Sequence, residues 1–600
     1  MSNLAALLFG ASALLGMAAG LGTLLRARTA QCFPMAAALA VALAYAAGLA
    51  GLLPAGAAAV FVLGAAGAVV CVVHSVRQRR VPQGLVTAAV CLFAVLAVSY
   101  YANGLRMYGA WDEFSHWGMA MRATRETHSL ARGADTPLQF VDYPPATALF
   151  AYVIGFFTPA FSEEASFVAM NLLCFCAMAP LLSDLSVRRP WPLLSAMLLA
   201  GVLPACMNAG AYSEIYVDSL EGILTGMALG CWFVRERTHA DVGSVAALLF
   251  VLVLTKPSGL GLAAIVLAIA GVDALRERKL RTWTPALAAT VLAKLSWSVY
   301  MHVCGHGSSW NLSTIDLLYI GETQKEVLLY FARALEERPL FSNWVPVTYM
   351  MGVAIFALMA WLFAQMLEPE RVKRLRGGFI GAALGSVAYA VTMLLLYMYV
   401  YTEREGTALA SYVRYMATYM QALWLMLLCI ALREGARVRM RVLVASAVVI
   451  LTTGDAGRLG YELLKSPMSV RGNRTYRADY QTVTAANDCL QPGEKLFIAT
   501  CADSLIEWYV ARYTAMLPGE KLNPPESCAM GEKYTWGAVG DPPEAQQWMD
   551  ELTANYQYVY LCWLDDAFMD SYGMLFEDGA KAYTVYRVDA QRRLLVEVQE

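Results

Sequence analysis

Long apolar runs separated by short polar segments fill most of residues 1–455. A helix needs about 20 apolar residues to cross a bilayer, so these runs predict membrane-spanning helices. They lie at residues 4–25, 34–53, 56–76, 84–101, 165–186, 191–207, 216–234, 243–255, 259–273, 283–303, 344–366, 378–401, 412–432 and 438–455. The pattern therefore predicts an α-helical polytopic membrane protein with about 14 transmembrane helices.

Lys and Arg fall in short clusters between these runs, and cytoplasmic loops of membrane proteins carry an excess of such charges. The clusters are Arg26/Arg28, Arg77/Arg79/Arg80, Arg188/Arg189, Arg235/Arg237, Arg276 to Arg281, Arg371 to Arg376 and Arg433 to Arg441. If all of them face the cytoplasm, the N-terminus, the 102–164 segment and the residues after about 456 are extracytoplasmic. This arrangement requires residues 146–161, too few to span comfortably, to lie along or dip into the outer face of the membrane.

The chain changes character after residue 456, where charges and paired prolines become frequent. Tyr556 to Trp563 and Ala582 to Val588 alternate apolar and polar positions, as strands do. We therefore expect a small extracytoplasmic α/β domain at the C-terminus. Its cysteines, Cys489, Cys501, Cys528 and Cys562, would face an oxidising compartment and could pair, although their spacing gives no connectivity.

The composition supports the membrane assignment and narrows the class of protein. The chain is 58% hydrophobic and only 15% charged, and its mean hydropathy is +0.49. Its net charge of −2 makes nucleic acid an unexpected partner and leaves the lipid bilayer as the expected environment. The 13 cysteines show no CxxC pair and no metal-site spacing.

A dense polar and aromatic group, Trp111-Asp112-Glu113-Phe114-Ser115-His116-Trp117, follows the apolar run that ends near residue 101. One interpretation is a solvated loop whose acids cap a short interfacial helix. The other is an active site at the membrane surface, with a carboxylate available as a general base and aromatic faces available to a sugar or a lipid head group. The residues alone leave both open.

Asp112 and His116 are four residues apart and would share one face of a helix. A carboxylate with a histidine suits a divalent cation, Mg or Mn, that keeps several water ligands. A hydrogen bond between the two side chains explains the spacing equally well. No cofactor is therefore certain, and a divalent ion at Asp112 and His116 stays an alternative.

Further polar groups fall on the same predicted outer side of the membrane. Ionisable residues at membrane edges are costly enough to suggest function, although Lys and Arg can also extend to the head groups. Two fixed cations near an outer leaflet are also what a lipid phosphate requires. The candidate donor-binding residues are His116, Tyr143, Asp218, Lys256, Arg414 and Tyr415.

Taken in order, these motifs resemble the membrane glycosyltransferases of the GT-C superfamily, which include protein mannosyltransferases and the lipid A aminoarabinose transferase. The resemblance rests on the acidic pair Asp112-Glu113, the later Tyr143-Pro144-Pro145, Asp218, the Leu-Thr-Lys-Pro-x-Gly motif around Lys256 and the Ser-x-x-Arg-Tyr motif around Arg414. In many relatives the acidic loop follows the first helix, whereas three additional helices precede it here.

The resemblance implies an inverting enzyme that takes a sugar from a polyprenyl-phosphate donor and gives it to an extracytoplasmic acceptor, such as a cell-surface glycan, lipid or protein. Asp112 would be the catalytic base, Glu113 its companion, and Lys256 and Arg414 contacts to the donor phosphate. The implied division is 1–83 for three additional helices, 84–455 for a GT-C-like catalytic module with an outer catalytic loop at 102–164, and 456–600 for the C-terminal domain.

Two other classes of membrane protein share some of these features. An O-antigen polymerase or ligase also uses lipid-linked glycans and outer-face arginines, although the acidic pair argues mildly against it. A lipid or solute transporter would show repeated halves or helices broken at matching positions. The sequence has one such break, at Lys256-Pro257-Ser258-Gly259, and no evident repeat.

Overall fold

The computed structural model of the protein describes residues 2–133, 136–208, 210–307, 319–342, 344–453, 477–502, 505–530 and 542–598. The chain divides into two compact units. The helical unit consists of Met1–Gly104 and Asp142–Lys465, and the C-terminal unit of Leu105–Val141 and Ser466–Glu600. The 105–141 part of the predicted outer loop thus groups with the C-terminal residues, and the predicted boundary at 455/456 lies outside the described residues.

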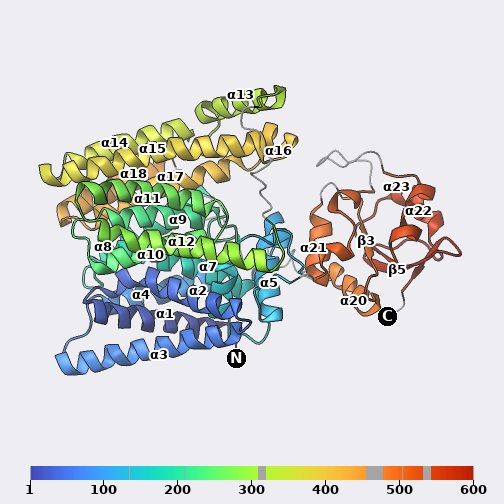
Figure 1. The fold of residues 1–600 in the computed structure, drawn as a ribbon, viewed down its shortest axis with the longest axis horizontal. Coiled ribbons are helices and arrows are strands. Elements are labelled where there is room, and N and C mark those ends of the chain that lie inside the picture. Colours follow the sequence, from blue (N-terminus) through green and yellow to red (C-terminus); the bar gives the residue numbers. More distant parts are fainter. Residues whose placement is uncertain are drawn as a thin grey trace. The chain divides into compact units, whose positions relative to one another are not determined.

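Each of the apolar runs identified in the sequence contains a helix of the helical unit (Figure 1). These helices are α1 (Asn3–Leu25), α2 (Phe33–Leu49), α3 (Leu53–Gln78), α4 (Leu85–Asn103), α7 (Glu163–Met178), α8 (Pro190–Met207), α9 (Asp218–Trp232), α10 (His239–Val253), α11 (Gly259–Arg276), α12 (Leu280–Val303), α14 (Tyr349–Ala364), α15 (Pro369–Tyr399), α17 (Tyr412–Leu432) and α18 (Ala436–Thr453). Shorter elements join them: α6 (Ala146–Ile154), α13 (Glu322–Glu337), α16 (Glu403–Ala408) and the hairpin strands β1 (Phe341–Ser342) and β2 (Pro346–Val347).

Nine helices of the described residues are long and apolar enough to cross a membrane, so the chain is an integral membrane protein. The sequence pattern predicts about 14 spans, and the difference lies in helices that are short or carry polar residues. Helices α10 and α14 are apolar but have only 15 and 16 residues. The nine-residue α6 rises about 14 Å, less than half of the hydrocarbon thickness, and agrees with the expectation that this segment does not span.

Helices α9 and α17 pack closely in the interior of the helical unit. Glycines on α9 permit the approach. A Cβ atom at Gly226 would lie 2.5 Å from the carbonyl oxygen of Ala422, and one at Gly222 would lie 2.6 Å from that of Thr418. Any larger side chain would therefore separate the two helices. This contact matters for the site, because Asp218 begins α9 and Arg414 lies in the first turn of α17.

The C-terminal unit contains a four-stranded sheet in the order β3-β4-β5-β6. Its strands are β3 (Leu496–Ala499), β4 (Tyr558–Leu561), β5 (Thr584–Asp589) and β6 (Leu594–Glu597), and its helices include α5 (Gly118–Thr127), α20 (Ala485–Cys489), α21 (Ile506–Ala515), α22 (Ala545–Asn555) and α23 (Asp566–Tyr572). The first pair is parallel, with Leu496 opposite Tyr558, and the other two pairs are antiparallel. Strands β4 and β5 lie within the two alternating segments, apart from Asp589 at the end of β5, so the α/β character predicted for this region is confirmed.

The core of the C-terminal unit lies between the sheet and its helices. Trp548 of α22 is fully buried and packs its ring against Phe497 of β3, with the centroids 5.8 Å apart. All four cysteines that the sequence suggested could pair are free thiols. Cys528 and Cys562 are completely buried, where a thiol acts as a small apolar side chain.

Candidate functional site

A buried cluster of charges in the helical unit brings together three of the candidate residues, from three separate elements. Lys256 lies in the break between α10 and α11, and its Nζ is 3.0 Å from Oδ1 of Asp218. Arg414 of α17 places its Nε 3.2 Å from Oδ2 of the same carboxylate. Asp218 is only 3% exposed. One carboxylate therefore holds two cations side by side, one on each oxygen.

Aromatic rings surround these two cations. The Lys256 ammonium lies 5.0 Å from the ring centroid of Tyr415. The Arg414 guanidinium lies 4.4 Å from the ring centroid of Tyr216 and 5.2 Å from that of Tyr415. Ring faces attract cations at these separations and exclude water from them. The segment that follows Tyr143 lies beside the one that carries Lys256, because the Ala146 N–H donates a hydrogen bond of 2.8 Å to the carbonyl oxygen of Leu254. Five of the candidate residues are therefore in this region of the helical unit.

The Lys256 ammonium retains capacity for a ligand. An ammonium has three N–H donors, and within the described ranges its one hydrogen bond goes to Asp218. An anionic group that reached Lys256 and Arg414 would thus meet a point charge and a planar guanidinium, the pair of donors that suits a phosphate.

Glu221 belongs to this cluster, although the sequence reasoning missed it. It lies one helical turn after Asp218, is 2% exposed, and accepts a hydrogen bond of 2.8 Å from the Ser258 hydroxyl. The contact ties α9 to the segment that carries Lys256. A second acid in the first turn of an apolar helix was the signal available in the sequence, because such a charge is costly to bury without a role.

The acidic pair of the predicted catalytic loop belongs to the C-terminal unit. Glu113 begins a single π-helical turn, η2 (Glu113–Trp117), and is 2% exposed. Its Oε2 accepts hydrogen bonds from the backbone N–H groups of Gly109 and Ala110, at 2.8 and 2.9 Å. Glu113 therefore fixes the turn that precedes it. Asp112 is only half-buried at the start of the same turn.

His116 is buried within η2, and its ring packs edge-on against Trp117 and Phe140, with centroids 4.7 and 5.6 Å away. Within the described part of the chain, no group of three or more His, Cys, Asp or Glu side chains is placed to hold a metal ion. A divalent cation at Asp112 and His116 therefore stays a prediction, and any such ion would depend on water or substrate for most of its ligands.

Helix α21 supports the segment that carries Asp112, a relationship that the sequence did not suggest. The ring centroids of Trp111 and Tyr509 are 5.0 Å apart, and Tyr509 accepts a hydrogen bond of 3.2 Å from Gln139. Arg122 donates a hydrogen bond of 2.7 Å to the carbonyl oxygen of Tyr513. Burial raises the pKa of Tyr509 to about 12, so its hydroxyl remains protonated at physiological pH.

The candidate residues thus form two groups. Tyr143, Asp218, Lys256, Arg414 and Tyr415 gather in the helical unit, whereas Asp112, Glu113 and His116 gather in the C-terminal unit.

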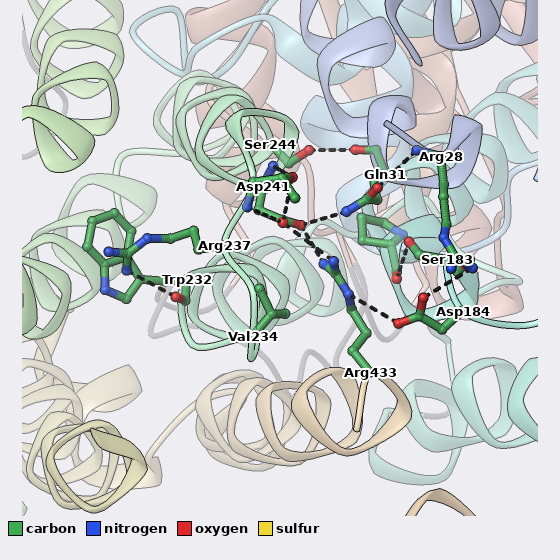
Figure 2. Close-up of polar contacts among 12 residues, drawn as sticks. Arg28, Gln31, Ser183, Asp184, Trp232, Val234, Arg237, Asp241, Ser244 and Arg433 are labelled. Atoms are coloured by element: carbon green, nitrogen blue, oxygen red, sulfur yellow. Dashed lines mark hydrogen bonds and ion pairs between the residues drawn. The ribbon is translucent and has the colours of Figure 1, made fainter. Parts of the chain in front are cut away.

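A second ionic cluster of the helical unit involves arginines that the sequence analysis treated only as markers of topology (Figure 2). Asp241, at the start of α10, accepts hydrogen bonds from Thr238 and Gln31 and forms an ion pair with Arg433. Arg433 also pairs with Asp184, at 3.8 Å. These contacts connect residues near the start of the helical unit's sequence with Arg433 near its end. Both carboxylates are paired with a cation, which indicates a structural role.

Comparisons with known proteins add a likeness among solved structures. No protein-family model and no curated protein matches the chain. Among solved structures, it is similar to ArnT from Cupriavidus metallidurans bound to undecaprenyl phosphate, with 15% identity over 80% of this chain and 94% of that chain and a TM-score of 0.39. ArnT belongs to the class that the motifs resemble. Because identity and TM-score are this low, the roles proposed for individual residues rest on the contacts within this chain.

Proposed function

We propose that the protein is a membrane glycosyltransferase that takes a sugar from a polyprenyl-phosphate carrier and transfers it to an extracytoplasmic acceptor. The observation that carries the proposal is the pairing of Lys256 and Arg414 on the buried carboxylate of Asp218. Burying two cations within a membrane-spanning unit has a considerable cost in free energy. A lipid phosphate that reaches the site from the membrane accounts for both of them.

In this proposal the two cations act on the leaving group. Transfer of the sugar breaks the bond between its anomeric carbon and the carrier phosphate, and negative charge then grows on the phosphate. Lys256 and Arg414 stabilise that charge in a buried site, where electrostatic interactions are stronger than in water. Asp218 keeps the two side chains together, and Tyr415 covers both cations.

The acceptor hydroxyl must lose a proton as it attacks the anomeric carbon. Asp112 is the proposed base, since it is a half-buried carboxylate at the start of a turn. Glu113 is the proposed positioning residue, because its hydrogen bonds to Gly109 and Ala110 hold that turn. The configuration at the anomeric carbon would be inverted, because the acceptor oxygen would attack the face opposite the leaving phosphate.

The proposed location is the plasma (inner) membrane, with the N-terminus, Asp112 and the C-terminal domain outside the cytoplasm. This sidedness follows from the basic clusters and the positive-inside rule. It would place the acceptor in the cell envelope and the carrier in the outer leaflet of that membrane.

The test uses purified full-length protein, a synthetic polyprenyl-phosphate sugar and a membrane extract as the source of acceptor. We expect Lys256→Ala and Arg414→Ala to insert and fold but to lower sugar transfer sharply, by about 10²-fold or more, because the leaving phosphate loses a countercharge. Lys325→Ala is the matched control, since this exposed lysine pairs only with Glu322 of its own helix among the described residues.

Three outcomes decide between the alternatives. Normal donor kinetics in both variants would return Lys256 and Arg414 to a structural role. Failure of the wild-type protein to release sugar from any carrier would count against the enzyme as a whole. Movement of the intact polyprenyl-phosphate sugar from one leaflet of a vesicle membrane to the other, without transfer of the sugar, would identify a transporter.

A further inference from the structure

An elongated groove runs between α11 and α15, away from the site described above. Its volume is about 880 Å³, within the range of sites that hold small ligands. The two helices run antiparallel and their register is visible at glycines of α15: a Cβ atom at Gly381 would lie 3.1 Å from Ile269, and one at Gly385 would lie 2.7 Å from Ile265. Because these positions lack side chains, α15 approaches Ile265 and Ile269 of α11 closely, and this contact forms the floor of the groove.

The greater part of the groove is apolar and open to the surroundings. Val272, Ile380 and Leu384 contribute to its walls and are 50%, 50% and 64% exposed. The lining extends along α15 from Glu370 to Ala388, which at the rise of an α-helix is about 27 Å. In a membrane-spanning unit, a groove of this kind takes up hydrocarbon chain rather than water.

One end of the groove is basic. Arg276 and Lys373 line it, both are exposed, and neither forms an ion pair within the described ranges of the chain. Glu370 is also part of the lining. Over residues 273–281 and 368–376 together, eight basic residues stand against four acidic ones, so this end carries a positive net charge.

The two other acids at this end are already neutralised from within the protein. Asp273 pairs with Arg237 at 3.3 Å and with Arg374 at 3.7 Å. Glu277 pairs with the same two arginines, at 3.0 and 2.8 Å. Among the lining residues, the charges that remain available to an outside molecule are therefore those of Arg276, Lys373 and Glu370, which leave a net charge of +1.

We propose that this groove binds one anionic glycerophospholipid. Its phosphate would lie at Arg276 and Lys373, and one acyl chain would follow the glycines of α15. Basic pockets between transmembrane helices at the cytoplasmic side are known to take acidic lipid head groups, and the positive-inside rule assigns this end to the cytoplasm. The proposal does not depend on the glycosyltransferase proposal, because the groove shares no residue with that site.

The test measures lipid retention by native mass spectrometry. The purified full-length protein is placed in detergent micelles that contain equal amounts of phosphatidylglycerol and phosphatidylcholine with identical acyl chains. We expect the wild type to retain one phosphatidylglycerol in preference to phosphatidylcholine. With two basic side chains removed, Arg276→Gln/Lys373→Gln should lower the affinity for phosphatidylglycerol about 30-fold.

Two matched controls separate the groove from general effects of charge and fold. Arg278→Gln/Arg281→Gln removes two exposed charges of the same basic cluster that do not line the groove, and should retain the lipid. Ala268→Phe fills the groove from an exposed lining position and should lose both lipids, whereas Ala264→Phe, one turn away and also exposed, should not. Equal retention of the two lipids by the wild type, or equal losses in a variant and its control, would overturn the proposal.

Discussion

Asp112 and Glu113 are neighbours in sequence but have different surroundings. Glu113 is buried and accepts two backbone hydrogen bonds, whereas Asp112 is half-buried at the start of the π-helical turn. A base must reach its substrate, and a positioning residue need not. The difference in surroundings therefore supports Asp112 as the base and Glu113 as the residue that orients it.

Replacing Asp112 by Asn keeps the size and polarity of the side chain but removes its ability to accept a proton. We expect Asp112→Asn to lower the rate of sugar transfer about 10²- to 10⁴-fold, with donor binding unchanged. Glu113→Gln should lower the rate less, because an amide oxygen can still accept a backbone hydrogen bond. Single-turnover kinetics with a measured donor Kd would check both, and full activity of Asp112→Asn would remove it from the mechanism.

Tyr509 makes the stability of the C-terminal unit depend on pH in the alkaline range. Burial raises the pKa of its hydroxyl from 10.0 to about 12 in the folded protein. The unfolded chain thus loses this proton first, and stability that is fully present below pH 10 is lost as the pH rises towards 12, by about 3 kcal/mol at most. Tyr509→Phe should lack that loss. Equal alkaline losses in chemical denaturation of both proteins would contradict the assignment.

At the scale of elements, the contact between α9 and α17 sets the distance between Asp218 and Arg414. The two helices approach closely because α9 has glycine where its backbone meets that of α17. Asp218 and Arg414 stand at the starts of these helices. The geometry of the charge cluster therefore depends on helix packing one to two turns further along α9 and α17.

Adding one methyl group at this contact should disturb the cluster. Gly226→Ala would place its Cβ 2.5 Å from the backbone of Ala422, and relieving that clash should cost about 1–3 kcal/mol. Gly261→Ala on α11 is the matched control, because a Cβ there meets nothing within 4 Å. Thermal unfolding in detergent should show a lower Tm for Gly226→Ala alone, together with reduced sugar transfer. A Tm equal to that of the control would show that α9 and α17 can separate freely.

At the scale of the whole molecule, sidedness decides whether the proposed site faces the envelope. The basic clusters predict that Arg79 and Arg374 lie in the cytoplasm. A reporter that is active only outside the cytoplasm should therefore work when fused after Asp135 or at the C-terminus, and fail after Arg79 or Arg374. Activity at the two arginine positions, or its absence after Asp135, would reverse the proposed orientation and exclude an outer-face acceptor.

The positions of the helices could be predicted from the sequence because hydropathy is a local property. Each apolar run became a helix, and the alternating segments near residues 560 and 585 became strands β4 and β5. The number of spans was less predictable, because a helix such as α10 is apolar and yet has only 15 residues. Residue chemistry was local as well, since Lys256, Arg414 and Asp112 were singled out by type and by their place at the ends of apolar runs.

Which of these residues contact one another depends on the tertiary structure. Asp218 of α9 contacts Lys256, which lies in the helix break before α11, and Arg414, which lies on α17. These three side chains therefore meet only when α9, α11 and α17 have packed together. The same holds for Glu221 with Ser258, and for the residues around Asp112 with α21. The membrane helices and the types of charged residue could be predicted from the sequence, because both depend only on residues that are close along the chain. The tertiary structure alone determined the site, because burial and pairing are set by residues far apart in sequence.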